Sequence, residues 1–327
     1  MKAIVYHKYG PPEILQLKET EKPTPKENEV LVKILATAVN DYDWVIVRGK
    51  PYLYRLMFGI IKPKRKIPGM ELAGMIEALG TNSTSFKTGD AVYGDISEYG
   101  FGSFAEYICI NEKALVLKPG KMSFEQAASI PHASMLAVQG LVSIGKVQKG
   151  EKILINGAGG GFGTFSLQIA RLYNTEVTGV DTGDKLEMMK SIGFDHVIDY
   201  RKEDFTKNGR RYDLILDAKT NRSTFAYLRS LKPNGRYVTV GGLISRLLQA
   251  FFLGLLVRFF NKKAIRIVAL KPNKDLDYIN ELFEEGKIKP VIDGPYKLNE
   301  VPEAIRYFGE GKHKGKVVIT LEHNNKH

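Results

Sequence analysis

A glycine-rich turn between a short apolar run and a helical pattern constrains the fold of this chain more than any other feature. Residues 153–163 read Ile-Leu-Ile-Asn-Gly-Ala-Gly-Gly-Gly-Phe-Gly, and apolar residues at helical spacing follow at once. In a strand–turn–helix unit, one glycine allows a tight turn, another lets a pyrophosphate approach the backbone, and a third lets the helix press onto the strand. The helix N-terminus adds free N–H groups and partial positive charge. The candidate binding residues are Asn156, Gly157, Gly160, Gly161, Phe162 and Gly163.

A second predicted strand, Glu176–Asp181, ends in an acid roughly 20 residues beyond the glycines, where dinucleotide folds hold the adenosine ribose. A carboxylate there favours NAD(H) and repels a 2′-phosphate. Lys185 follows closely, and Tyr200 ends the next predicted strand, so these two side chains could converge to hold that phosphate instead. The local chemistry leaves the choice between the two nucleotides open.

Length and charge bound the class of protein. The chain has 327 residues, enough for two domains, and 43% of them are hydrophobic, which is typical of a globular protein. The net charge of +12 attracts anions or simply keeps the surface solvated. Cys109 is the only cysteine, so the sequence excludes an intramolecular disulfide and a cysteine-rich zinc site. With a first strand that starts directly at the N-terminus, this predicts a cytoplasmic protein.

One segment tests that expectation. Residues 243–260 are strongly apolar, but Arg246, Gln249 and Arg258 interrupt them, and a membrane-spanning helix needs about 20 mostly apolar residues. A helix lying on an anionic membrane is one interpretation. A wall of a hydrophobic substrate cleft or a contact between two subunits is the preferred one, so we expect no membrane association.

Hydrophobic periodicity predicts three stretches of different character. Residues 1–122 show strands and turns with few helices, and residues 123–264 alternate helices and strands as in a doubly wound parallel sheet. Residues 265–327 are expected to complete that sheet and return to the first domain. The six strands predicted for the parallel sheet are Lys152–Asn156, Glu176–Asp181, His196–Asp199, Tyr212–Asp217, Arg236–Val240 and Ile265–Leu270.

Several motifs in order resemble the medium-chain dehydrogenase/reductase superfamily, and within it the zinc-independent quinone oxidoreductase-like branch. The resemblance runs nearly end to end. It implies an α/β fold in which a Rossmann-type parallel sheet is inserted into a β-rich, GroES-like catalytic domain. The matching pieces are Met1–Val5, Ala38–Trp44 with Arg48-Gly49, Pro68–Gly74, Gly89–Gly94, Gly102–Tyr107, the glycine loop, His196–Tyr200 and Gly315–Ile319.

The departures from zinc-dependent relatives concern metal ligands. Those relatives place a cysteine in the region of Asn40–Asp43 and a histidine where Met70 stands, and they carry a four-cysteine lobe. Asp41, Asp43 and Glu71 remain as oxygen donors, but zinc sites normally recruit Cys or His as well. The sequence therefore predicts no metal site.

The resemblance also assigns cofactor residues. Lys185 and Tyr200 match positions that bind the 2′-phosphate in NADPH-using members, whereas Asp181 departs from their usual small residue. The family thus implies NADP(H), and Asp181 leaves NAD(H) possible. Gly241 and Gly242 resemble backbone that faces the nicotinamide.

A further resemblance places Asn273 near the nicotinamide end of the cofactor.

The predicted reaction is hydride transfer from NAD(P)H to a quinone or an enone, without zinc. Asn40 is the first candidate to orient a small hydrophobic carbonyl substrate, and Asp43 is a proton relay or a structural acid. Tyr42 and Tyr52 are possible phenolic donors. His132 is expected to be a structural histidine.

Three alternatives remain. A 2-enoyl thioester reductase would use basic residues to steer a CoA phosphate, and a zinc-free alcohol dehydrogenase would oxidise alcohols. A nucleotide-gated RNA-binding protein ranks last, because no aromatic-and-basic RNA motif is present, so no nucleic-acid partner is expected. The sixth strand and the apolar segment before it suggest a homodimer. The basic residues of the first alternative are Lys62, Lys64, Arg65 and Lys66.

Overall fold

The computed structural model describes residues 1–260 and 263–323, and the chain divides into two compact units. Unit 1 comprises Met1–His132, Pro272–Leu276 and the chain from Ile292 onward, and unit 2 comprises Ala133–Lys271 and Asp277–Val291. The helices of the two units are α1 (Asp41–Arg48), α2 (Arg55–Phe58), α3 (Phe124–Ser129), α4 (Pro131–Val138), α5 (Gly161–Arg171), α6 (Leu186–Ser191), α7 (Thr224–Ser230), α8 (Ile244–Phe260), α9 (Leu276–Glu284) and α10 (Val301–Gly309).

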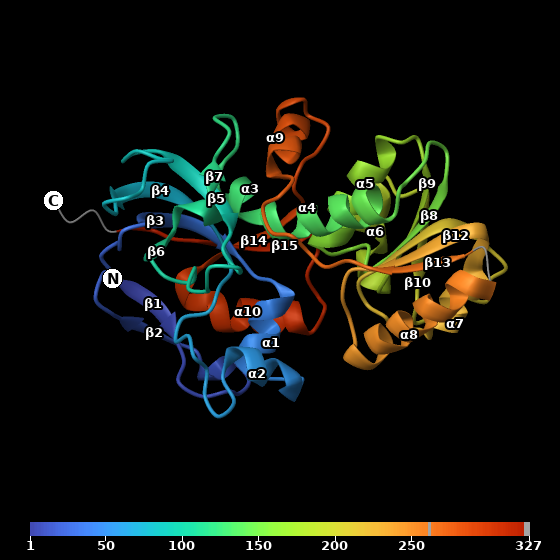
Figure 1. Cartoon of the computed structure of the whole chain (residues 1–327), viewed down its shortest axis with the longest axis horizontal. Helices are drawn as coiled ribbons and strands as arrows, with labels where there is room; N and C mark the ends of the chain where they lie inside the picture. The colour runs from blue at the N-terminus through green and yellow to red at the C-terminus, as the bar shows by residue number, and fades with distance from the viewer. Residues whose placement is uncertain (261–262, 324–327) are drawn as a thin grey trace. The chain divides into compact units, whose positions relative to one another are not determined.

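Unit 1 is built on a mostly antiparallel sheet in which β14-β15-β3-β4-β5-β7 lie side by side and β6 also pairs with β3 (Figure 1). A separate hairpin joins β1 and β2. Alternating buried side chains of the long strand β3 face a core that α1 and α10 help to cover. The strands are β1 (Lys2–Val5), β2 (Gln16–Glu19), β3 (Glu29–Ala38), β4 (Glu71–Leu79), β5 (Ala91–Asp95), β6 (Tyr107–Asn111), β7 (Val116–Leu117), β14 (Ile292–Lys297) and β15 (Lys316–Thr320).

The boundary between the units lies later than the sequence suggested. Ser123 caps α3 by accepting a hydrogen bond from the backbone N–H of Gln126, whose side chain accepts one from the backbone N–H of Ser123. This helix packs against β3, β4 and β15, so it belongs to unit 1. The first crossing between units therefore follows His132 and not Met122.

Unit 2 contains a six-stranded sheet in the order β10-β9-β8-β11-β12-β13, and every neighbouring pair is parallel. Helices α5 and α6 lie on one face and α7 and α8 on the other (Figure 1). The predicted doubly wound sheet is thus confirmed. The strands are β8 (Lys152–Asn156), β9 (Glu176–Asp181), β10 (His196–Asp199), β11 (Tyr212–Asp217), β12 (Leu231–Thr239) and β13 (Ala264–Ile267).

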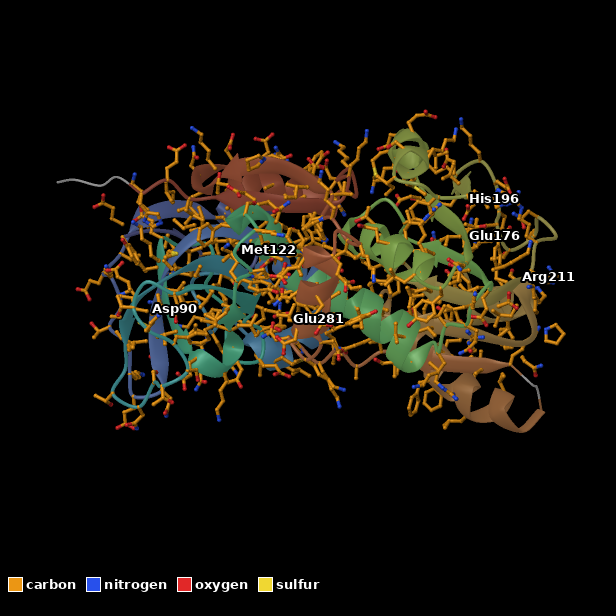
Figure 2. The ribbon with its side chains drawn as sticks, turned by 90° about the horizontal axis from the view of Figure 1, so that it is seen from above. Asp90, Met122, Glu176, His196, Arg211 and Glu281 are labelled. Carbon is orange, nitrogen blue, oxygen red and sulfur yellow. The ribbon has the colours of Figure 1, made fainter. Side chains whose placement is uncertain are left out.

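The two ends of this sheet differ in chemistry. At the amino ends, Glu176 pairs with Lys152 at 2.7 Å and with His196 at 3.2 Å; Lys152 is exposed, and Glu176 and His196 are half-buried. Figure 2 shows Glu176 and His196 close together on neighbouring strands. At the carboxyl ends, buried polar side chains replace such surface pairs. Open parallel sheets bind ligands at the carboxyl ends, near the point where strand order reverses, here between β8 and β11.

The apolar segment predicted from residues 243–260 forms α8. The helix packs on β13 through its buried face, which includes Ala250. None of the helices in the described part of the chain is long and apolar enough to cross a membrane. The side chains that α8 and the residue before it leave exposed are Leu243, Leu248, Phe251, Phe252 and Leu255.

Candidate nucleotide-binding and catalytic sites

The glycine loop of unit 2 connects β8 to α5. Gly157 has a φ of +93°, a conformation that favours glycine, and its N–H and that of Ala158 donate to the Val180 carbonyl. A Cβ on Gly163 would lie 2.4 Å from backbone atoms of Ala158, so only glycine allows α5 to approach the turn this closely. Both glycines hold the shape that the sequence predicted for them.

The start of α5 can accept an anion. Gly160 precedes the helix with extended backbone angles and is partly exposed, whereas Gly161 is buried and Phe162 is half-buried. The first N–H groups of a helix lack acceptors within it and sit at the positive end of its dipole. A glycine-lined turn followed by such a terminus fits a dinucleotide diphosphate.

Asp181 does not present a free carboxylate. One oxygen accepts from the Gly159 N–H at 2.9 Å, and the other accepts from the Thr182 N–H at 2.9 Å and lies 3.2 Å from the Lys185 ammonium. Asp181 and Lys185 are both buried. Burial lowers the pKa of Lys185, an effect that Asp181 opposes. The acid and the lysine expected to compete for the ribose end therefore neutralise each other.

Tyr200 lies beside this ion pair. Its backbone N–H donates to the Asp181 carbonyl at 3.2 Å, because β10 pairs with β9 in register. Its ring is half-buried against the core of unit 2. The structure thus brings Asp181, Lys185 and Tyr200 to one end of two neighbouring strands.

Lys219 is a candidate that sequence reasoning missed. It follows β11, and its Cε lies 3.2 Å from where a Cβ of Gly157 would be. Burial is the main cause of the lowered pKa of Lys185, and the positive charge of Lys219 lowers that pKa further. Lys219 is exposed, and among the described residues no carboxylate lies within ion-pair distance of its ammonium. No motif marks it, because only the pairing of β11 with β8 brings it to the loop.

The structure gives Asn156 and Gly242, two further residues predicted to bind the cofactor, local structural roles. The Asn156 amide is fully buried and donates to Asp217 at 2.8 Å and to Asn221 at 2.9 Å. These contacts tie together the chain around β8 and β11 and favour a structural role over direct cofactor contact. Gly242 has a φ of +118°, and a Cβ there would lie 2.2 Å from the Thr220 hydroxyl.

The neighbouring Gly241 accepts a hydrogen bond at its carbonyl from the Thr239 hydroxyl at 2.9 Å. It leaves space on its Cβ side, since no heavy atom lies within 4 Å of that position. That the backbone of Gly241 and Gly242 faces the nicotinamide stays a prediction.

A buried polar cluster lies in unit 1 around Glu71. One Glu71 oxygen accepts from the Asn40 amide at 2.6 Å and lies 2.5 Å from the Lys316 ammonium, and the other accepts from the backbone N–H of His132 at 2.5 Å. Lys316 also donates to the amide oxygen of Asn40. The Asn40 side chain is therefore engaged at both ends and buried, which favours a positioning role over direct contact with a substrate.

Asp43 lies next to this cluster and closes the start of α1. Its carboxylate accepts from the backbone N–H groups of Asn40 at 2.8 Å and Gly69 at 3.0 Å. Burial raises the pKa of Asp43 to about 7, against the lowering effect of the two backbone donors. The structural role that the sequence allowed for Asp43 is thus visible in its contacts.

His132 extends the cluster. Its Nδ1 lies 2.9 Å from an Asp95 carboxylate oxygen, and both side chains are buried. Burial lowers the pKa of His132, but the hydrogen bond and charge of Asp95 outweigh it and raise the pKa overall. The Tyr42 ring packs edge-on against the His132 ring with centroids 6.2 Å apart.

Tyr42 is better placed than Tyr52 to donate a proton or hydrogen bond. Its ring is half-buried, and no hydrogen-bond acceptor for its hydroxyl occurs among the described residues. Burial raises its pKa, with smaller contributions from nearby groups that include Asp95, so the phenol stays protonated. Tyr52 is 66% exposed and takes no part in the cluster.

Asn273 lies beside Asp95 in unit 1 but its side chain is occupied. Its amide oxygen accepts from the Asp95 N–H at 2.8 Å, and its amide nitrogen donates to the carbonyls of Asp95 at 2.8 Å and Ala114 at 3.0 Å. Its φ is +59°. These contacts anchor the returning chain to β5, and they favour a structural role over the expected cofactor contact.

The donor set around Glu71 does not fit zinc. Met70, which the resemblance puts in place of a histidine ligand, is buried and offers only a thioether, and the Lys316 ammonium already lies 2.5 Å from one Glu71 oxygen. Within residues 1–260 and 263–323, no three His, Cys, Asp or Glu side chains gather in a way that could hold a metal ion.

Comparisons with known proteins cover both units. Residues 26–120 match the family described as alcohol dehydrogenase GroES-like domain, and residues 192–319 match the family described as zinc-binding dehydrogenase. The 2-methylene-furan-3-one reductase of Solanum lycopersicum is 33% identical over 98% of this chain and 79% of its own length.

Two further comparisons are similar in extent. The chloroplastic NADPH-dependent alkenal/one oxidoreductase of Arabidopsis thaliana is 32% identical over 98% of this chain and 79% of its own length. The solved structure of the quinone oxidoreductase from Coxiella burnetii superposes with a TM-score of 0.85 at 26% identity, covering 98% of this chain and 99% of that one.

Proposed function

Because this chain belongs to the medium-chain dehydrogenase/reductase superfamily, in its quinone oxidoreductase-like branch, we propose that it reduces quinones and other conjugated carbonyls with NADPH. The observation that carries the proposal is the glycine loop at the start of α5, whose shape fits a dinucleotide diphosphate. Relatives named for reducing an alkenal/one and a furanone point to the same acceptor class.

The preference for NADPH rests on a relative named NADPH-dependent, and the charges around the loop permit it. Asp181 would repel a 2′-phosphate only if its charge were free, and Lys185 pairs with it. Lys219 adds a positive charge beside Gly157. We assign Lys219 to the diphosphate, which both nucleotides share, and Lys185 with Tyr200 to the 2′-phosphate. The predicted roles of Gly241 and Gly242 remain part of this proposal.

When bound, the nicotinamide supplies the hydride. Negative charge develops on the carbonyl oxygen of the acceptor during the reduction, and a positioned donor stabilises it. Tyr42 is our candidate for that donor, because its phenol is protonated and has no other acceptor among the described residues. Asn40, Glu71 and Lys316 act through position, since their mutual contacts fix the start of α1 that carries Tyr42.

We further propose that zinc takes no part. The family description of residues 192–319 names zinc, but Lys316 already supplies the positive charge that Glu71 pairs with. An acceptor whose carbonyl is activated by conjugation needs no Lewis acid of the kind that alcohol oxidation requires.

The proposal is tested by steady-state kinetics on an acceptor panel: a naphthoquinone, an alkenal, crotonyl-CoA and, in the reverse direction, simple alcohols. We expect turnover of the quinone or the alkenal with NADPH at a higher kcat/KM than with NADH. Preferred turnover of crotonyl-CoA would establish the enoyl thioester reductase instead, and alcohol oxidation would establish an alcohol dehydrogenase.

Assembly and location complete the proposal. Strand β13 ends the six-stranded sheet, and an exposed edge of this kind can pair with a second copy. We propose a homodimer formed there, which light scattering of the purified protein tests. We also propose the cytoplasm as the compartment, on the basis of the single cysteine, although several relatives are named chloroplastic or mitochondrial.

A further inference from the structure

The chain between Asp43 and Glu71 contains no acidic residue. It carries seven basic ones, against a net charge of +12 for all 327 residues. This acid-free segment, residues 44–70, includes the C-terminal part of α1, a short 3-10 turn (Tyr52–Tyr54) and α2. The basic residues are Arg48, Lys50, Arg55, Lys62, Lys64, Arg65 and Lys66.

The segment is ordered by its own aromatic residues. The centroid of the Phe58 ring lies 5.5 Å from that of Phe101, and the Phe58 ring stacks with the Tyr54 ring. Phe58 and Tyr54 each pack edge-on against Tyr42. The Tyr9 hydroxyl donates to the Gly59 carbonyl at 2.6 Å. These contacts fix which side of the segment faces the core of unit 1.

The opposite side of the segment exposes aliphatic side chains. Ile61 is 89% exposed, and four others are between 57% and 68% exposed. In Figure 1, α2 lies at the lower edge of unit 1. A folded segment that turns five large apolar residues to solvent while Tyr54 and Phe58 pack against Tyr42 presents a surface for another apolar phase. The five residues are Leu53, Leu56, Met57, Ile60 and Ile61.

The apolar and basic parts of the segment are contiguous in space. Met57 and Phe58 share the lining of a cavity of about 250 Å³ with Lys64 and Arg65. Lys64, Arg65 and Lys66 also line a second cavity of about 660 Å³. One acid, Glu98, lines the first cavity and one, Glu29, lines the second, so cations remain in excess at both.

We propose that the acid-free segment docks the protein on an anionic lipid bilayer, with the aliphatic side chains inserted and the basic side chains at the phosphates. This combination of exposed Leu, Ile and Met with Lys and Arg defines an interfacial membrane element. A nucleic acid would match the basic residues but offers no partner for aliphatic side chains. A second copy of the chain would bring two positively charged segments together.

Helix α8 exposes a comparable apolar face, and residues 218–274 around it are also free of acidic residues. The described cations beside that face are engaged within unit 2, where Lys263 donates to the Leu228 carbonyl at 2.8 Å. The exposed residues Leu248, Phe251 and Leu255 stand on a helix whose described cationic side chain, Arg246, contacts Gln249. The proposal therefore places docking on the acid-free segment of unit 1 and not on the apolar segment that the sequence singled out.

The test is co-sedimentation of the full-length protein with vesicles of phosphatidylcholine alone or mixed equally with phosphatidylglycerol. We expect binding to the anionic vesicles only, weakened as salt rises from about 0.1 M to about 1 M, where the screening length falls from about 10 Å to about 3 Å. No binding to the anionic vesicles, or binding unaffected by salt, would overturn the proposal without changing the kinetics expected above.

Two multiple variants test the two halves of the surface. Replacing four exposed bases of the segment should weaken binding roughly 600-fold, at about five-fold per base. A matched control removes four exposed lysines elsewhere in unit 1 and should change binding little. The variant is Lys62→Gln/Lys64→Gln/Arg65→Gln/Lys66→Gln, and its control is Lys18→Gln/Lys87→Gln/Lys113→Gln/Lys121→Gln.

The apolar half of the surface is tested by replacing three exposed apolar side chains of the segment with serine, and, as a control, three on α8. Each variant must unfold at the same temperature as the wild type, so that lost binding does not reflect lost folding. Loss of binding in the segment variant and not in the α8 control supports the proposal. If only the basic variant loses binding, the surface recognises polyanions such as RNA; if the α8 control loses binding, α8 docks. Either result overturns the proposal. The variants are Leu56→Ser/Ile60→Ser/Ile61→Ser and, on α8, Leu248→Ser/Phe251→Ser/Leu255→Ser.

Discussion

The glycine loop of unit 2 and the buried polar cluster of unit 1 are assembled in opposite ways. The loop is one continuous stretch, residues 156–163, whose backbone forms the proposed nucleotide site. The cluster joins residues as far apart as Asn40 and Lys316, which are 276 positions apart, and its side chains satisfy one another. A backbone site depends on local shape, whereas the cluster depends on charge balance, so the two should respond differently to substitution.

The largest effect is expected where charge balance is broken. Lys316→Met leaves Glu71 as a buried carboxylate without its cation, which should lower the free energy of unfolding by about 4 kcal/mol. Chemical denaturation measures this. Lys314→Met, an exposed neighbour, is the matched control and should change stability by less than about 0.5 kcal/mol. Restored stability in the double variant Lys316→Met/Glu71→Gln would confirm the pairing, and unchanged stability of Lys316→Met would refute it.

Changing the shape of the loop should remove nucleotide binding without unfolding the protein. Gly160→Val places a side chain at the entrance to α5, where the backbone angles tolerate it, and should weaken NADPH binding by about 100-fold or more. Fluorescence titration measures the Kd. Gly120→Val, at an open position in unit 1, serves as the control. Unchanged affinity in Gly160→Val would remove the loop from the site.

A side chain at the edge of the cluster should matter for turnover alone. Tyr42→Phe removes the proposed donor to the acceptor oxygen and should lower kcat by about 100-fold while the Kd for NADPH stays the same. Single-turnover and titration measurements separate these quantities. Tyr278→Phe in unit 2 controls for loss of a phenol. A normal kcat in Tyr42→Phe would rule out the proposed donor.

Lys219 is the one side chain that we assign to the otherwise backbone-built diphosphate site, so its substitution should weaken binding less than a change in the shape of the loop. Lys219→Ala should weaken NADPH and NADH about 10-fold each, since both share the diphosphate. The exposed Lys202→Ala is the control. A loss confined to NADPH would move Lys219 to the 2′-phosphate, contrary to the assignment made here.

The smallest effect concerns pH. Asp95 raises the folded-state pKa of His132 despite burial, so the His132 contribution to stability is complete below the ordinary histidine pKa and is lost as pH rises through the raised value. The pKa of Asp95 is lowered, against burial, so its contribution persists down to acidic pH. The stability difference between the wild type and His132→Gln should therefore shrink from pH 5.5 to pH 8.5. A difference that is constant with pH would mean that His132 is neutral throughout.

The sequence predicted features that depend on local residues, as the glycine loop does, better than features that depend on distant residues, as the polar cluster does. The six strands of the parallel sheet and the roles of Gly157 and Gly163 follow from local patterns, because turn geometry and strand burial depend on neighbouring residues. The short strands β2 and β7 were not predicted, since they are brief and largely exposed.

Side-chain partners were harder to predict. That Asp181 turns inward to Lys185, that Asn40 is engaged at both ends and that Asn273 grips β5 all depend on three-dimensional packing. Lys219 and the pairing of Lys316 with Glu71 had no local signal at all. The acid-free segment was visible in the sequence, but only the structure shows that its aliphatic residues face outward.

The most direct measurement is turnover of a naphthoquinone by protein stripped with a strong chelator, with bound NADPH followed by fluorescence and zinc by elemental analysis. The account predicts saturable NADPH binding and undiminished quinone reduction in preparations that contain far less than one zinc per chain. Failure to bind either reduced nucleotide, or activity that returns only when stoichiometric zinc is added back, would contradict it.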